Sequence, residues 1–192
     1  MIPPEILYEA YTQGFFPMAD SQQPEKIEWY SPQWRAVFPL YDIVQPRSLR
    51  KFIEKHNLKF TINFDFEFVI KQCSQRETTW ISKEIIDSYI ELYKVGYAHS
   101  IETWLEDEIV GGLYGVAIGG AFFGESMFNT ISNGAKAAFF YLIEHLKKQK
   151  FVLLDSQFIN DFTMQLGAIE IHRELYLSKL KYALTQNCVF IE

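Results

Sequence analysis

Three strand-like segments joined by very short turns, in the middle of the chain, constrain its fold more than any other feature. Residues 98–105, 109–118 and 121–127 have the pattern of buried strands, and Asp107-Glu108 and Gly119-Gly120 separate them. Runs of this kind that meet at two-residue turns are typical of β-hairpins. We therefore expect an antiparallel meander of three strands at the centre of the fold.

One carboxylate interrupts the third of these strands. Glu125 follows Phe122-Phe123-Gly124 and precedes Ser126-Met127-Phe128, so it enters an otherwise apolar and aromatic stretch. An ionised carboxylate in such surroundings is costly unless it is paired or hydrogen-bonded. A charge kept there is a candidate functional group, and the alternative is a solvated glutamate at the end of a strand.

The segments on either side of the meander alternate between helical and strand patterns. Helices are expected over residues 5–12, 47–56, 65–74, 83–95, 133–148, 162–167 and 173–184. Strands are expected over residues 27–30, 35–40, 59–63 and 152–154, with an edge strand at 189–191 and an apolar turn at 15–18. This order predicts a mixed α/β fold, in which the helices pack around one mixed sheet in an α+β arrangement. A boundary near Ser31-Pro32 would give a small N-terminal domain, residues 1–31, and a larger domain, residues 32–192.

Charge, cysteine content and hydropathy exclude several classes of protein. The 192-residue chain has a net charge of −6, which argues against a globally basic nucleic-acid binder but leaves a local basic surface open. Cys73 and Cys188 lack metal-ligand spacing. No signal peptide or transmembrane segment is recognised, so we expect a cytoplasmic protein. The aromatic content of 17% indicates an apolar pocket or simply an aromatic core.

An ordered series of short motifs runs along nearly the whole chain. It comprises Ala10-Tyr11, Gly14, Phe16-Pro17, Trp29-Tyr30-Ser31-Pro32, Arg35-Ala36-Val37, Trp80-Ile81, Gly96, Ala98-His99-Ser100-Ile101-Glu102, Trp104, Gly111-Gly112-Leu113-Tyr114-Gly115, Gly124-Glu125-Ser126-Met127-Phe128, Asp155-Ser156-Gln157 and Leu166-Gly167-Ala168. The series resembles the leucyl/phenylalanyl-tRNA–protein transferase family. The sequence departs from the family pattern in a shortened N-terminal segment, in Met18 where a tryptophan is usual, in Gly134-Ala135 where Ala-Ser is usual, and in Ser156 where a cysteine is usual.

The resemblance implies an N-acetyltransferase-like (GNAT) acyltransferase fold with a small N-terminal domain. It implies transfer of Leu or Phe, and Met less well, from aminoacyl-tRNA to proteins that begin with Arg or Lys, within the N-end rule degradation pathway. An aminoacyl-tRNA ester is already activated, so we expect no metal or other cofactor. The resemblance also implies a monomer that does not bind membranes.

The residues expected to act in the reaction are Asp155, Gln157 and Glu125. Asp155 and Gln157 follow the apolar strand 152–154, at a spacing that places both side chains on one face. By resemblance, Gln157 contacts the attacking amine or the developing oxyanion, and Asp155 orients it; the alternative is an aspartate that caps the following turn. An Asp with an ordinary pKa near 4 is a poor base for an ammonium, so a proton relay or prior loss of the proton is as plausible. Glu125 is expected to face the basic acceptor terminus, with an internal salt bridge as the alternative.

The amino-acid pocket and the tRNA surface are assigned by aligned position and by charge. The pocket is expected to include Leu113, Phe122, Phe139 and Leu142, which could also be ordinary core residues. Trp80 is expected to stack on the terminal adenosine, with Trp29 and Trp34 as alternates. The tRNA phosphates are expected to contact one side of a helix that carries Arg47, Arg50, Lys51 and Lys55, with Lys147, Lys148 and Lys150 as the second candidate. A solvated helix face is the alternative for each basic cluster.

Two other functions remain open at this stage. One is an acyl-CoA-dependent N-acetyltransferase on the same fold, although the sequence offers no pyrophosphate loop at a helix start. The other is a non-catalytic binder of basic N-termini or of aminoacyl-tRNA. His99 stands beside Ser100, but adjacent residues of a strand point to opposite faces, so we interpret His99 as structural.

Overall fold

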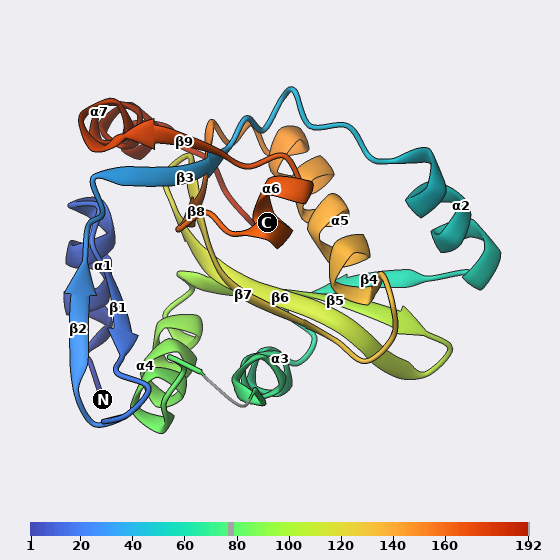
Figure 1. Ribbon diagram of the computed structural model, residues 1–192, viewed down its shortest axis with the longest axis horizontal. Helices are drawn as coiled ribbons and strands as arrows, with labels where there is room; N and C mark the ends of the chain where they lie inside the picture. Colours follow the sequence, from blue (N-terminus) through green and yellow to red (C-terminus); the bar gives the residue numbers. More distant parts are fainter. Residues whose placement is uncertain (77–78, 192) are drawn as a thin grey trace.

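The computed structural model describes residues 1–76 and 79–191. It contains a seven-stranded sheet whose strand order is β4-β5-β6-β7-β8-β3-β9 (Figure 1). The strands are β3 (Trp34–Phe38), β4 (Lys59–Ile62), β5 (Ala98–Leu105), β6 (Glu108–Ile118), β7 (Ala121–Asn129), β8 (Leu153–Gln157) and β9 (Ile169–His172). Neighbouring strands are antiparallel except β7 and β8, which are parallel.

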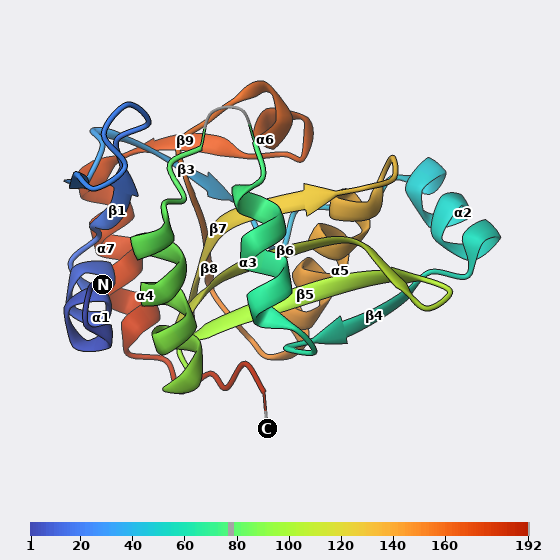
Figure 2. The ribbon, with the colours of Figure 1, turned by 90° about the horizontal axis from the view of Figure 1, so that it is seen from below.

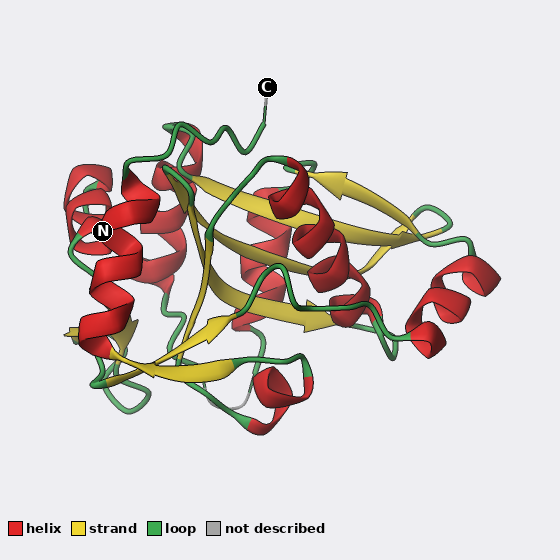
Figure 3. Ribbon diagram, turned by 90° about the horizontal axis from the view of Figure 1, so that it is seen from above, coloured by secondary structure: helices red, strands yellow, loops and turns green. Residues whose placement is uncertain are grey.

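Helices cover both faces of this sheet. α3 (Phe66–Ser74) and α4 (Lys83–Lys94) lie on the face seen in Figure 2, and α5 (Gly134–Lys148) crosses the opposite face seen in Figure 3. α1 (Pro4–Thr12) and α7 (Arg173–Leu184) pack together at one end, and α2 (Arg47–His56) stands at the other end. α6 (Asp161–Gln165) follows β8.

Polar side chains at the helix starts explain several of these boundaries. The Asp65 and Ser82 side chains accept hydrogen bonds from backbone N–H groups in the first turns of α3 and α4. Asn160 and Thr163 form a reciprocal capping box at the start of α6. Such caps satisfy N–H groups that have no partner inside the helix.

The hydrophobic core has two parts, one on each face of the sheet. The part beneath α3 and α4 includes Val69, Tyr89 and Phe123, and the part beneath α5 includes Phe139 and Leu154. Residues from the N-terminal segment extend the first part, because Leu7, Tyr11 and Phe16 are fully buried in it.

The N-terminal segment also contains a separate hairpin. β1 (Phe16–Ala19) and β2 (Ile27–Tyr30) pair with each other in a two-stranded antiparallel sheet that is separate from the seven-stranded sheet. We propose a division of the chain between residues 31 and 32, since the hairpin has a sheet of its own. The neighbouring helix α1, however, shares the main core.

The mixed α/β fold class is confirmed, and so are the meander and the helices predicted before and after it. Two local predictions are wrong. Residues 15–18 were expected to form a turn, but Pro17 lies inside β1, where an edge strand tolerates a missing N–H. Residues 189–191 form no strand; Phe190 is buried against the rings of Phe122 and His99 instead. The short strand β9 was not predicted.

Candidate active site

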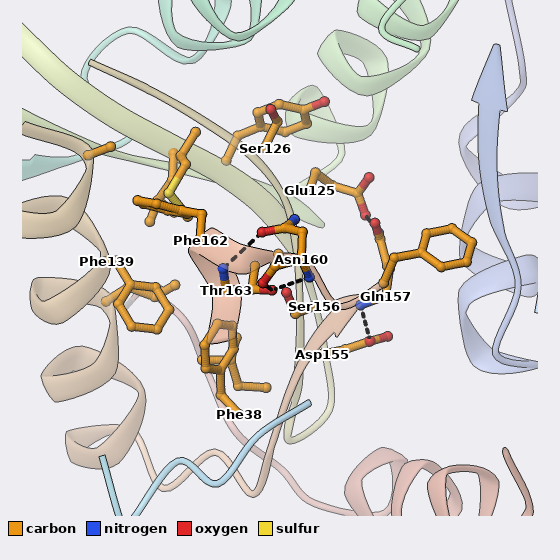
Figure 4. A pocket seen from close by; sticks show the side chains of 18 of the residues that line it. Phe38, Glu125, Ser126, Phe139, Asp155, Ser156, Gln157, Asn160, Phe162 and Thr163 are labelled. Atoms are coloured by element: carbon orange, nitrogen blue, oxygen red, sulfur yellow. Dashed lines mark hydrogen bonds between the residues drawn. The ribbon is translucent and has the colours of Figure 1, made fainter. Parts of the chain in front are cut away.

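A cavity of about 410 Å³ lies where β7 and β8 stop pairing. The parallel ladder between them covers residues 121–123 of β7 and 153–155 of β8. Farther along, Glu125 and Ser126 line the cavity from one strand and Ser156 and Gln157 line it from the other. Figure 4 shows Glu125 and Gln157 facing each other on one side, while Phe38, Phe139 and Phe162 gather on another.

An irregular pairing in each strand aims these side chains. Tyr114 and Gly115 of β6 pair with Ser126 and Gly124 of β7. Glu125, which lies between these two partners, is therefore the extra residue of a β-bulge. In β8, the pairing with β3 likewise skips Ser156. A bulge redirects the side chains beside it, which is why bulges occur often next to active sites.

Among the described residues, Glu125 accepts hydrogen bonds only from uncharged donors. Tyr11 Oη donates to Oε1 at 2.6 Å, Tyr89 Oη donates to Oε2 at 3.2 Å, and Gln157 Nε2 donates to Oε1 at 2.6 Å. No Lys, Arg or His in residues 1–76 and 79–191 forms an ion pair with it. The internal salt bridge considered for Glu125 is therefore absent from this part of the chain.

Burial raises the pKa of Glu125 to about 7. The hydrogen bonds from Tyr11 and Tyr89 and the charge of Arg35 oppose this shift, whereas the nearby Asp155 adds to it. Glu125 is therefore a carboxyl group whose pKa lies near neutral pH and which forms no ion pair with a cation among the described residues. A cationic ligand would supply the missing counter-charge.

Asp155 differs from Glu125 because a cation holds it. Its side chain is completely buried and forms an ion pair with Arg35 (Nη2 to Oδ2, 2.6 Å). Tyr176 Oη donates to Oδ2 at 2.7 Å, and the backbone N–H of Gln157 donates to Oδ1 at 2.8 Å. The last bond is the turn-capping contact weighed as the alternative for Asp155. Removing one partner of a buried pair of this kind typically costs about 3–5 kcal/mol of stability.

Gln157 joins the two carboxylates. Its backbone donates to Asp155 and its carboxamide donates to Glu125. Its φ of +64° lies in the left-handed region, which residues other than glycine adopt at a cost. Strained backbone at a cavity is a common property of functional sites. The structure thus brings Asp155, Gln157 and Glu125 together, although the Gln157 side chain contacts Glu125 and not Asp155.

Three of the four residues expected in the amino-acid pocket line the cavity. Leu113 comes from β6, and Phe139 and Leu142 come from α5. Phe122 does not line it, because its ring is fully buried and stacks on Phe190 with centroids 5.2 Å apart. The sequence does not show this difference, because both residues are apolar and both belong to the same part of the core.

Trp80 lies at the cavity, whereas the two alternate tryptophans do not. The Trp80 side chain is half-buried and lines the cavity together with Met18. The same two residues border a second cavity of about 550 Å³, which Tyr30 also lines. Trp29 and Trp34 are 39% and 54% exposed on the surface, and Trp34 packs edge-to-face on His172.

The two basic clusters also differ. The four predicted residues of α2, Arg47, Arg50, Lys51 and Lys55, are all exposed at the end of the molecule away from the β1–β2 hairpin (Figure 1). In the second cluster, the ammonium group of Lys147 already has two partners in the protein, since it donates to the Ile43 carbonyl and pairs with Glu144. Lys148 and Lys150 are exposed.

Four residues of the site were given no role from the sequence: Arg35, Tyr11, Tyr89 and Tyr176. Their hydroxyl and guanidinium groups converge on the two carboxylates from β3, α1, α4 and α7. Tyr11 and Arg35 belong to the motif series that resembles the family, and Arg35 is also a charged residue inside an apolar strand pattern. His99, interpreted as structural, is buried against Phe190.

An apolar cavity with an unpaired carboxylate and a carboxamide at one side is suited to joining an apolar donor to a cationic acceptor. A site of this composition is that of a group-transfer enzyme. Residues 1–33 match the family model described as leucyl/phenylalanyl-tRNA protein transferase N-terminal domain, and residues 37–181 match the model described as leucyl/phenylalanyl-tRNA protein transferase. The chain belongs to the leucyl/phenylalanyl-tRNA protein transferase family.

Relatives at high identity extend over the whole chain. A leucyl/phenylalanyl-tRNA–protein transferase from Gloeobacter violaceus is 49% identical and covers 98% of this chain and 97% of its own length. The protein of the same name from Chlorobaculum tepidum is 45% identical, with complete coverage of both chains. A solved structure of L-PGS from Bacillus licheniformis aligns at a TM-score of 0.45 and 16% identity, over 82% of this chain and 51% of its own.

None of the helices among the described residues is both long enough and apolar enough to cross a bilayer.

Proposed function

We propose that this protein transfers leucine or phenylalanine, and methionine less well, from aminoacyl-tRNA to the α-amino group of proteins whose first residue is Arg or Lys. The observation that carries the proposal is the cavity between β7 and β8, which combines an apolar wall with the Glu125–Gln157 pair. The family model and the relatives' names support the donor class.

The apolar wall is assigned to the donor amino acid. Leu113, Phe139 and Leu142 offer hydrocarbon and aromatic surface and no charge. Such a wall rejects small or charged side chains, because each methylene-sized difference in burial changes binding by about 1–3 kcal/mol. It does not strongly distinguish Leu, Phe and Met, and this fits a limited leakage to methionine.

Glu125 is assigned to the cationic end of the acceptor. Its hydrogen bonds come from neutral groups, so its negative charge is not compensated within the described residues. An Arg or Lys at the acceptor terminus would provide both the counter-charge and the N–H donors. This assignment accounts for the selection of basic N-terminal residues.

The reaction depends on alignment of the amine with the ester carbonyl more than on activation of the ester, which is already reactive. The neutral amine nitrogen attacks the ester carbonyl carbon, the bond between that carbon and the ribose oxygen breaks, and the departing oxygen takes the proton that the amine loses. An α-amino group has a pKa near 8, so a useful fraction is neutral at physiological pH. The second N–H of the Gln157 carboxamide is suited to stabilise the oxyanion, because only one of its two N–H groups is needed for Glu125.

Trp80 and the basic face of α2 are assigned to tRNA. Trp80 beside Met18 is the candidate platform for the terminal adenosine, and the exposed basic residues of α2 are the candidate contact for acceptor-stem phosphates. We further propose that the protein acts in the cytoplasm, where both substrates are present. We also propose that it is a monomer and acts in the N-end rule pathway.

Transfer itself is the test. The protein is incubated with radiolabelled Phe-tRNA and a peptide that begins with Arg, with matched peptides that begin with Ala or carry an acetylated N-terminus. We expect label in the Arg peptide alone. Binding of the peptide without incorporation would identify a non-catalytic recogniser, and modification only from acetyl-CoA would identify an N-acetyltransferase. Either result would overturn the proposal.

A further inference from the structure

The Arg35 guanidinium holds both carboxylate oxygens of Asp155. Its Nε donates to Oδ1 at 2.9 Å and its Nη2 donates to Oδ2 at 2.6 Å, while Nη1 donates to the Gly14 carbonyl at 3.1 Å. Both side chains are buried, at 1% and 0% exposure. A planar fork that grips two oxygens fixes the orientation of a carboxylate as well as its position.

Two aromatic rings hold Arg35 in turn. Its Cζ lies 4.5 Å from the ring centroid of Phe16 and 4.5 Å from that of Tyr176. Phe16 also packs edge-to-face on Phe158, the residue after Gln157, with centroids 5.5 Å apart. The N-terminal segment, β3 and α7 therefore meet at one guanidinium, directly behind the candidate site.

Asp155 in turn positions Gln157. It accepts the backbone N–H of Gln157 at 2.8 Å, at the residue whose backbone is left-handed. From that backbone the carboxamide reaches Glu125 at 2.6 Å. Asp155 lines the cavity, but its oxygens are occupied by Arg35, Tyr176 and this N–H, so it is poorly suited to accept a proton from the substrate.

We propose that Arg35 is a positioning residue for the transfer reaction, which acts through Asp155 on the placement of the Gln157 carboxamide. The inference rests on the proposed function, because it assigns Arg35 to the same site. A chain in which residue 35 cannot grip both oxygens keeps the cavity and Glu125, so it binds both substrates and transfers slowly.

Kinetics of matched variants test the proposal. The full chain is compared with Arg35→Lys, which keeps the charge but loses the fork, and with Tyr176→Phe, which removes one donor to Asp155 and keeps the ring over Arg35. Arg173→Lys is the control, because Arg173 also ties α7 to the N-terminal segment, through the Ser31 carbonyl, but on the surface. The readouts are kcat and KM for an Arg-initiated peptide, and hydrogen exchange at the Gln157 amide.

For Arg35→Lys we expect kcat to fall roughly 100-fold with KM nearly unchanged, as for a misplaced reacting geometry. The Gln157 amide should lose protection while amides of α5 keep theirs. For Tyr176→Phe we expect a smaller loss in kcat, and none for Arg173→Lys. Methylguanidinium should restore part of the rate to Arg35→Ala.

Other outcomes overturn the proposal. A folded Arg35→Lys variant with normal kcat, or one that changes only KM, would show that Arg35 has no positioning role. If neither Arg35 variant folds, an unchanged kcat in Tyr176→Phe would argue against the inference. If the wild type transfers nothing, the proposed function fails. Hydrogen exchange at the Gln157 amide of the Arg35→Lys variant then still shows whether Arg35 positions Gln157.

Discussion

Tyr11 donates a 2.6 Å hydrogen bond to Glu125, 114 positions farther along the chain. The bond makes α1 part of the candidate site, because the hydroxyl reaches the carboxylate through the core that α1 shares with the sheet. Tyr89 approaches the same carboxylate from α4 and also contacts the Tyr11 hydroxyl. The charge of Glu125 thus depends on phenol groups from two separate helices.

Replacing Tyr11 by Phe should weaken the use of basic acceptors. The loss of a hydrogen bond to a charged group costs about 1.5–3 kcal/mol, so the ionised form of Glu125 becomes less favourable and its pKa rises. We expect KM for an Arg-initiated peptide to increase about tenfold at pH 7, with KM for Phe-tRNA unchanged. Steady-state kinetics with each substrate varied in turn measure both constants.

Tyr8→Phe is the matched control for Tyr11→Phe. Tyr8 lies on the same helix but is 37% exposed, and its ring packs on Tyr97 and not on the site. It should behave as the wild type. Equal peptide KM values for Tyr11→Phe and Tyr8→Phe would mean that the phenol does not support the charge of Glu125.

Acceptor binding should depend on pH through Glu125. Burial raises the pKa of Glu125 to about 7, so the group is mostly neutral below this pH and negative above it. A neutral carboxyl attracts a cation poorly, and the affinity for an Arg-initiated peptide should therefore fall as the pH decreases from 8 to 6. Calorimetric titrations across this range measure the change.

The Glu125→Gln variant separates this effect from titration of the peptide amine. Because glutamine has no ionisable group, the variant should bind the peptide weakly at every pH and lose the change near pH 7. If wild type and variant follow parallel curves, the pH dependence belongs to the peptide or to another group.

The shape of the apolar wall should set the choice between donors. Leu142 lines the cavity, so Leu142→Phe narrows it and should reduce the kcat/KM for Phe-tRNA about tenfold more than that for Leu-tRNA. Phe122→Leu is the control, because Phe122 is buried outside the cavity; it should lower stability without changing the donor ratio. A donor ratio altered equally by both variants would indicate a general loss of packing.

Local patterns in the sequence predicted the strand that carries Glu125 and the strand end that carries Asp155 and Gln157. A carboxylate among phenylalanines is visible in one dimension, and so is a polar pair after an apolar strand. The partners of these residues are not visible, because Arg35 meets Asp155 across 120 positions and Tyr176 reaches it from another element. Such pairings depend on the order of strands in the sheet, which no local pattern specifies.

The misplaced residues have physical reasons of the same kind. Residues 189–191 have strand propensity, but the chain places Phe190 in a gap between His99 and Phe122, so packing overrides the local preference. Phe122 was expected in the pocket on the basis of its aligned position, yet its ring is fully buried and stacks on Phe190 in the closed part of the core. This contact joins residues 68 positions apart, and no local pattern foresees it.

The exposed basic face of α2 should carry the salt dependence of tRNA use. Each phosphate contact that is lost reduces the slope of log affinity against log salt by about 0.7–0.9. The double variant Arg50→Glu/Lys55→Glu should therefore raise KM for Phe-tRNA several-fold at low salt and flatten its salt dependence. Transfer from a small aminoacyl-adenosine donor, which lacks the acceptor stem, should remain as in the wild type.

Lys71→Glu/Lys83→Glu is the charge-matched control. Both lysines are exposed, and they belong to α3 and α4, which cover the face of the sheet opposite α5. The same double change there should leave the salt slope as it is. If Lys148→Glu/Lys150→Glu flattens the slope and the α2 variant does not, the acceptor stem lies along the C-terminal end of α5. If none of the three pairs changes the slope, phosphate contacts come from backbone amides or from residues nearer the cavity, and the basic face of α2 is only a solvated helix surface.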